Sequence, residues 1–300
     1  MVALEGRLAV GQVHHFTYGW ITPAFAYAMS FLGSLLGLVS TARARASTDK
    51  RRRAWLLVLA AWAIGGTGIW VMHFMAMIGF SVTNSPLRYD VPITIASFLI
   101  AVVMTGIGLF IVGYGKRSAW KVLVGGPITG VSVAFMHYTG MAAMRLNGHI
   151  GYDRRLVVAS YAIAIVAATV ALWFTVVVRG TVATGAAAVV MGIAVCSMHY
   201  TGMAAMHVQV SDSYADVAGV DVNWFLAPIV LFVLVVVMAL VSAVMAVPSE
   251  REAAANARLA EQFSTQPEPV KPSFGGPAPA SRAARLTTGQ TFSPRRRPGP

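Results

Sequence analysis

The chain has 300 residues, of which 57% are hydrophobic and 11% charged, and its formal net charge is +12. Soluble proteins carry roughly 25% charged residues, so this composition excludes an ordinary soluble domain and indicates a membrane protein. In a soluble chain the positive charge would suggest nucleic acid as a partner. Here the basic residues concentrate in particular loops, and no nucleic-acid partner is expected.

Seven stretches lack Asp, Glu, Lys and Arg, and each is long enough to cross about 30 Å of hydrocarbon as a helix. Helices are expected because a segment in lipid must satisfy its own backbone hydrogen bonds, and because these stretches lack the two-residue alternation of barrel strands. The stretches are Trp20–Ser40, Ala54–Phe80, Val91–Gly115, Val122–Met144, Leu156–Val178, Thr181–Met206 and Val222–Val247. The predicted fold is an all-α membrane protein with seven transmembrane helices, built from three repeated two-helix units plus a closing helix.

Basic residues in the loops predict the orientation of these helices. The loops after the first, third and fifth stretches hold ten Lys and Arg residues, whereas the other three loops hold four. The positive-inside rule therefore places the N-terminus outside and the C-terminus in the cytoplasm. We expect an extracytoplasmic N-terminus at 1–16, a membrane domain at 17–247 and a disordered cytoplasmic tail, rich in Pro and Arg, at 248–300.

A methionine–histidine pair occurs three times within the predicted helices, and its histidines are His73, His137 and His199. They are separated by 64 and then 62 residues, which indicates an internal repeat. A glycine stands seven residues before each histidine, where a small residue lets neighbouring helices approach closely. These glycines, predicted to serve packing, are Gly66, Gly130 and Gly192.

The spacing around each histidine predicts a set of metal ligands. At about 100° per residue, methionines four and seven positions after a histidine lie on the same helix face. The second and third copies have both methionines, whereas the first has only one because Phe80 occupies the outer position. Thioether and imidazole donors favour copper, especially Cu(I), over hard cations. The candidate ligands are His73, Met77, His137, Met141, Met144, His199, Met203 and Met206, with Met72, Met136, Met198 and Cys196 as further candidates.

A packing role is the alternative interpretation, since methionine fills gaps in helical cores well. For a single copy that reading would be favoured. Three copies change the balance, because an ionisable side chain inside a bilayer is costly and marks a functional site by default. Each histidine lies seven or eight residues before the outer end of its stretch, a depth of roughly 10–12 Å. One site shared by three helices and several separate sites both remain open.

The tetrapeptide Met-His-Tyr-Thr at 136–139 and 198–201 resembles the signature of the bacterial MHYT domain family, and the resemblance covers about residues 12–247. In the first copy Phe74 and Met75 replace Tyr and Thr. The resemblance implies a sensory module of the cytoplasmic membrane that binds copper through these histidines and methionines. It also implies a diatomic gas ligand (oxygen, carbon monoxide or nitric oxide) and a cytoplasmic signalling partner of unknown identity.

Family members often carry cytoplasmic domains for cyclic-di-GMP turnover or histidine-kinase signalling. No such domain is recognisable in this sequence, and we expect no enzymatic activity. Two other functions remain open: transport or delivery of copper across the membrane, and the binding of haem between paired histidines, as in membrane cytochromes. Uptake assays in vesicles would test the first, and an absorption spectrum the second.

Overall fold

The computed structural model describes residues 8–10, 12–83, 85–115, 118–211 and 217–221, together with scattered positions between 224 and 262. The chain divides into two compact units, Met1–Glu252 and Ala253–Pro300. All the elements below belong to the first unit. Most of the predicted tail at 248–300 and part of the predicted N-terminal segment at 1–16 lie outside the described residues.

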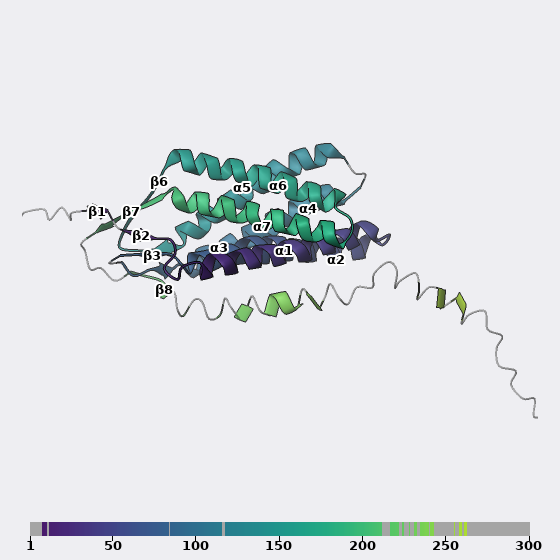
Figure 1. Ribbon diagram of the computed structural model, residues 1–300, viewed down its shortest axis with the longest axis horizontal. Helices are drawn as coiled ribbons and strands as arrows, with labels where there is room; N and C mark the ends of the chain where they lie inside the picture. The colour runs from purple at the N-terminus through teal and green to yellow at the C-terminus, as the bar shows by residue number, and fades with distance from the viewer. Residues whose placement is uncertain are drawn as a thin grey trace, which may run out of the picture. The chain divides into compact units, whose positions relative to one another are not determined.

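Six helical spans among the described residues are long and apolar enough to cross a membrane. The second span, Lys50–Met77, is continuous but changes its winding: an α-helix leads into a π-helix, which leads into a last α-helical turn. The elements are α1 (Ile21–Ala46), α2 (Lys50–Ala61), the π-helix η1 (Trp62–Val71), α3 (Met72–Met77), α4 (Val91–Gly113), α5 (Ala119–Ala142), α6 (Arg154–Val177) and α7 (Thr181–Ala204) (Figure 1). The first six predicted spans are therefore confirmed as helical.

Aspartate caps set the start of three of these helices. Asp49 accepts backbone hydrogen bonds at the start of α2, Asp90 does so for α4 and Asp153 for α6. An aspartate at this position satisfies amide groups that the first turn leaves without a partner. Between α6 and α7 the chain turns at Gly180, whose φ of 82° is a conformation that glycine adopts readily.

The six spans form a closed ring by their packing. α1 packs on η1 and α3, η1 packs on α4, and α4, α5, α6 and α7 follow one another, after which α7 packs back on α1. The sequence predicts that a seventh helix, at 222–247, closes the bundle. In the structure the contact between α1 and α7 already closes the ring. Much of that stretch lies outside the described residues. At one described position, Phe232 contacts Phe98 of α4 edge-on at 5.8 Å between ring centroids.

The polarity of the bundle is that of a membrane protein. On α4, Ile95, Leu99 and Val103 are each more than half exposed, and they follow one another at four-residue spacing on the outer face. The inner face of the same helix buries Ser97 and Thr105. Large apolar side chains therefore face outward and small polar ones inward, which suits a lipid surrounding.

Eight short strands gather at one end of the bundle, where α3, α5 and α7 end and where α4 and α6 begin (Figure 1). They form three small antiparallel sheets, in the orders β1-β7-β6, β2-β3 and β5-β4-β8. The strands are β1 (Leu8–Val10), β2 (Val13–His14), β3 (Ser81–Val82), β4 (Arg88–Tyr89), β5 (Met144–Arg145), β6 (Gly148–Tyr152), β7 (Met206–Ser211) and β8 (Val220–Asp221). Only loops were expected here, so the short strands are an addition to the predicted all-α membrane bundle, whose helical architecture is confirmed.

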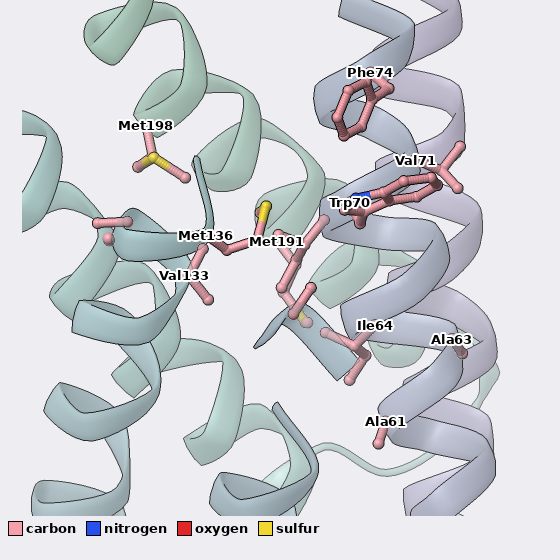
Figure 2. Packing of buried hydrophobic residues seen from close by; sticks show 14 of the residues in the cluster. Ala61, Ala63, Ile64, Trp70, Val71, Phe74, Val133, Met136, Met191 and Met198 are labelled. Atoms are coloured by element: carbon pink, nitrogen blue, oxygen red, sulfur yellow. The ribbon is translucent and has the colours of Figure 1, made fainter. Parts of the chain in front are cut away.

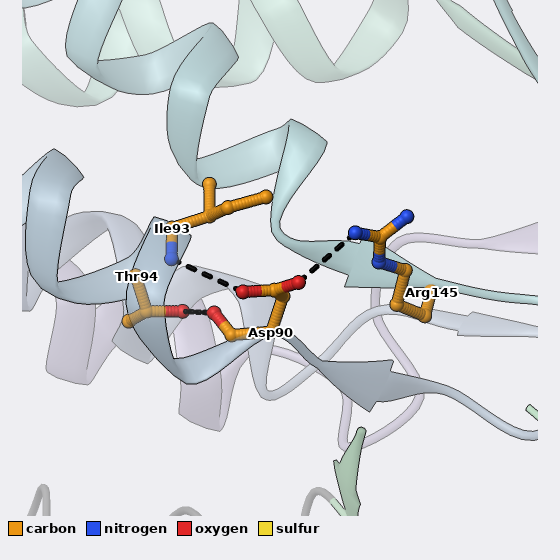
Figure 3. A network of polar contacts seen from close by, with 4 residues as sticks. All are labelled: Asp90, Ile93, Thr94 and Arg145. Carbon is orange, nitrogen blue, oxygen red and sulfur yellow. Dashed lines mark hydrogen bonds and ion pairs between the residues drawn. The ribbon is translucent and has the colours of Figure 1, made fainter. Parts of the chain in front are cut away.

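An ion pair ties the strand layer to the start of α4 (Figure 3). Arg145 of β5 donates to the Asp90 carboxylate at 2.9 Å, and the same carboxylate accepts from the backbone of Ile93 at 3.2 Å. The Thr94 hydroxyl donates to the backbone oxygen of Asp90 at 2.8 Å. The hydrogen bond from Arg145 and then that from Ile93 lower the pKa of Asp90 below its usual 3.8.

This lowered pKa predicts a loss of stability in acid. A carboxyl with a lower pKa in the folded state stabilises the fold above its unfolded pKa, and the effect is lost as the pH falls through the folded value. Melting temperatures measured from pH 6 to pH 3 should fall more steeply for the native chain than for Asp90→Asn, because the amide in that variant has no charge to lose. Parallel curves would show that Asp90 makes no such contribution.

Candidate metal centre

Three histidines occupy matching places on three different helices. His73 lies in α3, His137 in α5 and His199 in α7, each four or five residues before its helix ends. At about 1.5 Å per residue this is roughly 6–8 Å below the helix ends, nearer than predicted because the helices are shorter than expected. All three side chains are at most 1% exposed, and the strand layer lies beyond them.

The three imidazole rings meet at one point in the bundle. His73 Nδ1 lies 3.1 Å from His199 Nδ1 and 3.1 Å from His137 Nδ1. The ring centroids are 5.0–5.1 Å apart, and each pair of rings is close to perpendicular. These histidines are the one group of three or more His, Cys, Asp or Glu within the described residues that could hold a metal ion. Of the two arrangements left open by the sequence, the structure has the one in which the three histidines lie together in a single cluster.

Hydrogen bonding alone leaves this histidine centre (His73, His137 and His199) unsatisfied. The Nε2 atoms of all three rings are buried without a hydrogen-bond partner. A neutral imidazole has one N–H and one lone pair. If the proton is on Nε2, that N–H has no acceptor, and the lone pairs of the Nδ1 atoms of neighbouring rings face each other. A proton on Nδ1 of His73 can be shared well with only one of its two neighbours. Either way a buried polar group is left uncompensated, which is costly.

A cation between the Nδ1 atoms would remove this conflict, because three lone pairs would then face one positive charge. Nitrogens that share a metal ion at about 2.0–2.1 Å lie roughly 3.3–3.6 Å apart, a few tenths of an ångström wider than the observed contacts. No carboxylate joins the centre among the described residues. A neutral nitrogen donor set suits a borderline or soft transition metal better than Mg²⁺ or Ca²⁺. The residues present therefore fit a copper ion.

Two glycines make the close approach of the rings possible. A Cβ on Gly140 would lie 2.5 Å from His73 Nε2, and a Cβ on Gly202 would lie 2.4 Å from His137 Nε2. Each of these rings thus packs against the helix of the next repeat. The prediction missed both residues, although each stands three positions after a histidine in the repeated motif. At the same position in the first copy stands Ala76, which is buried.

The predicted methionine ligands divide into two groups. Met77, Met141 and Met203 lie within their helices one turn after each histidine, and all three are buried. Met144 and Met206 are buried as well, but the helices end at Ala142 and Ala204, so both lie in strands. The helical spacing used to place these two on the histidine face therefore does not apply to them. Their role as ligands stays a prediction.

The further candidates lie elsewhere around the centre. Met136 and Met198 belong to the main apolar cluster of the bundle, near Val133, Met191 and Ile64 (Figure 2). Met72 belongs to a second cluster with Ala26 and Ala76, on which Cys196 and Tyr200 pack. Cys196 is not part of the group that could hold a metal ion.

Tyr138, which follows His137, faces a neighbouring helix, as its position about 100° around the helix predicts. Its hydroxyl group lies 2.7 Å from Ser160 Oγ of α6, and its ring stacks on Tyr161 at 5.7 Å. Tyr138 therefore joins α5 to α6 and holds His137 in position from the side.

The repeat seen in the geometry matches a known family. The MHYT family, described as "Bacterial signalling protein N terminal repeat", matches residues 66–126, 130–188 and 192–259. The three matches begin at Gly66, Gly130 and Gly192, the glycines seven residues before each histidine. No solved structure matches the chain.

Curated relatives are signalling proteins of bacteria. The bifunctional diguanylate cyclase/cyclic di-GMP phosphodiesterase MucR of Pseudomonas aeruginosa is 34% identical over 79% of this chain, which covers 35% of MucR. The signalling protein YkoW of Bacillus subtilis is 29% identical over 64% of this chain, which covers 24% of YkoW. The chain thus spans about a third or less of the length of these relatives. With three family matches over more than half of its length, the chain belongs to the MHYT family of bacterial membrane signalling proteins.

Proposed function

We propose that this chain is a membrane-embedded sensor that binds one copper ion through His73, His137 and His199 and responds to a diatomic gas or to redox state. The observation that carries the proposal is the convergence of three buried imidazoles, with Nδ1 atoms 3.1 Å apart. Cytoplasmic signalling partners are proposed from the names of the relatives, one of which, MucR, is a diguanylate cyclase and cyclic di-GMP phosphodiesterase. The proposed orientation places the strand layer outside and the basic loops in the cytoplasm.

Contact between the three rings favours a single ion over a haem. A haem held by two histidines needs the macrocycle between them, and nitrogens 3.1 Å apart leave no room for it. Copper transport would need soft ligands along a path through the bundle. The histidine centre is instead enclosed on one side by the strand layer and on the other by apolar side chains such as Val133 and Met198.

The protein's own residues would hold the ion and couple it to the helices. The three histidines would supply the nitrogen donors, and Met77, Met141 and Met203 are candidate thioether donors one turn away. Burial keeps water from the centre, and the fixed positions of the rings tie α3, α5 and α7 together. Bound copper would supply one-electron redox chemistry and an affinity for diatomic gases. If the ion changed its oxidation state or bound a gas, the nitrogen–nitrogen spacing that it prefers would change. That change would act on α3, α5 and α7 at once and would shift the bundle between two helix arrangements.

Metal analysis of the purified full chain tests the proposal. The native chain should retain close to one copper per chain after desalting, and alanine at any one of His73, His137 or His199 should lower retention at least tenfold. The matched control is His149→Ala, which removes an exposed histidine of the strand layer. Equal copper in the native chain and in all three centre variants would refute the proposal.

A further inference from the structure

A cavity lies inside the ring of helices, next to the histidine centre on the side away from the strand layer. It has a volume of about 50 Å³ and is bounded by η1, α4, α5, α6 and α7. Three of the residues that line it stand four positions before a histidine, which is about one helical turn or roughly 6 Å along the helix. These residues are Ile69, Val133 and Val195. Each repeat therefore contributes one side chain to the wall between the cavity and the three rings.

The wall of this cavity is apolar. Its described lining residues are Ala, Val, Ile, Leu and Met, apart from Thr105, Thr129 and Thr175. The Thr175 hydroxyl donates to a backbone oxygen of its own helix at 2.6 Å. Thr105 Oγ1 lies against Gly65 of η1, and Thr129 Oγ1 lies against Gly108 of α4. The threonine hydroxyls thus lie at contacts between or within helices, and no charged side chain is among the described lining residues.

The small side chains of α6 create the space. Four alanines of this helix line the cavity at three- and four-residue spacing, so they share one helix face. They are Ala164, Ala167, Ala168 and Ala171. The opposite walls carry larger side chains, such as Ile64 of η1, Val133 of α5 and Met191 of α7, which lie around the same interior space (Figure 2). A larger residue on this face of α6 would therefore fill the cavity.

Size and polarity limit what the cavity can hold. A buried water takes up roughly 10–15 Å³ of such a volume, so the cavity has room for a molecule of two or three heavy atoms and is too small for a haem or a lipid chain. A buried water typically makes three hydrogen bonds. Of the described lining residues, only Thr105 and Thr129 have hydroxyl groups without a hydrogen-bond partner. Apolar cavities of this kind stay dry and bind uncharged apolar molecules such as xenon.

We propose that this cavity binds one molecule of an apolar gas and holds it about one helical turn from the histidine centre. Transfer of an apolar molecule from water into such a cavity is favourable, whereas ions and water are excluded. The physiological role rests on the proposed function, because a diatomic gas bound here would lie beside the copper ion. Binding of the gas to the cavity itself needs no metal.

Xenon and oxygen are the probes for this site in metal-free full-length protein. With ¹³C-labelled Ile and Val methyl groups in detergent, the NMR signals of Ile69, Val133 and Val195 should shift along a saturable curve as xenon pressure rises. The signal of Ile95, exposed on the outer face of α4, should shift linearly, because xenon also dissolves in the detergent. Dissolved oxygen, which is paramagnetic, should broaden the three cavity signals at least threefold more than that of Val208, which is buried in the strand layer.

A pair of substitutions on α6 separates the cavity from the lipid-facing surface. Ala168 lines the cavity and is 9% exposed, so Ala168→Leu should fill it and lower the xenon affinity at least tenfold. The matched control is Ala162→Leu, which adds the same side chain to an exposed position of the same helix and should change the affinity less than twofold. Circular dichroism identifies a variant that does not fold, and the oxygen measurement on the native chain needs no variant.

Three results would overturn the proposal. One is a linear xenon shift at Ile69, Val133 and Val195 that matches the shift at Ile95. Another is equal saturation in the native chain and in folded Ala168→Leu. The third is magnetisation transfer from water to the methyl groups of Thr105 and Thr129, which would show that water fills the cavity. Because all these measurements use metal-free protein, a failure to bind copper would refute the proposed function and leave this inference standing.

Discussion

Alanine at Gly140 or at Gly202 is expected to lower copper retention at least tenfold, although neither residue has a side chain that could bind a metal. The added Cβ would stand 2.4–2.5 Å from an imidazole nitrogen, well inside van der Waals contact. Because both rings are fully buried, they cannot move aside without separating the helices or leaving the centre. Overpacking of this kind also costs about 1–3 kcal/mol of stability.

Gly185 of α7 provides the matched control for this substitution. A Cβ at that position meets no atom within 4 Å, so Gly185→Ala adds the same methyl group to the same helix in open space. It should leave the copper content unchanged and raise stability slightly, since alanine is a better helix former than glycine. Native copper content in both Gly140→Ala and Gly202→Ala would contradict the packing of each ring on the next repeat.

Alanine at Gly130 is expected to be among the most destabilising substitutions in the bundle, at about 3 kcal/mol. Its Cβ would lie 2.4 Å from Ile165 Cα and 2.7 Å from the Ala164 oxygen, both backbone atoms of α6. Backbone cannot rotate aside as a side chain can, so α5 and α6 would have to move apart.

Gly66 occupies the corresponding position in the first repeat, so Gly66→Ala is the matched control for Gly130→Ala. The nearest atoms to its Cβ would be side-chain carbons of Phe98 and Val102 at 3.6 Å, which is ordinary contact. Gly66→Ala should therefore be tolerated while Gly130→Ala is not. Thermal unfolding in detergent, followed by circular dichroism, measures both. Equal melting temperatures for the two variants would show that the close approach of α5 and α6 at Gly130 does not determine the stability of the bundle.

Much of the bundle could be predicted from the sequence because lipid imposes a simple rule. A chain that crosses hydrocarbon must be apolar over some twenty residues and helical, and the charges that interrupt it mark the loops. The repeated Met-His pair then placed His73, His137 and His199 at one depth. Spacing along a helix, however, says nothing about which helices are neighbours, so a single shared site could not be told from three separate ones.

The strand layer, the π-helix and the ends of α5 and α7 could not be predicted, because they depend on residues that are far apart in the sequence. Strands of two to six residues are too short for a pattern, and Arg88 of β4 pairs with both Arg145 and Asp221, which lie far along the chain. The π-helical winding of Trp62–Val71 likewise depends on packing, since nine of its ten residues are buried. The early ends of α5 and α7 follow from the strand pairing of Met144 and Met206, which a helical reading of the motif cannot show.

The packing of His73 on Gly140, and of His137 on Gly202, bears on how such a chain could arise by duplication. The second and third repeats each receive a ring from the repeat before them, whereas the first copy has Ala76 at the corresponding position, so a single unit cannot build the centre. Two copies would supply only two of the three rings that meet in the centre. Three is thus the smallest number of copies at which the three-ring arrangement is complete, and the loss of one repeat would dismantle it in a single step.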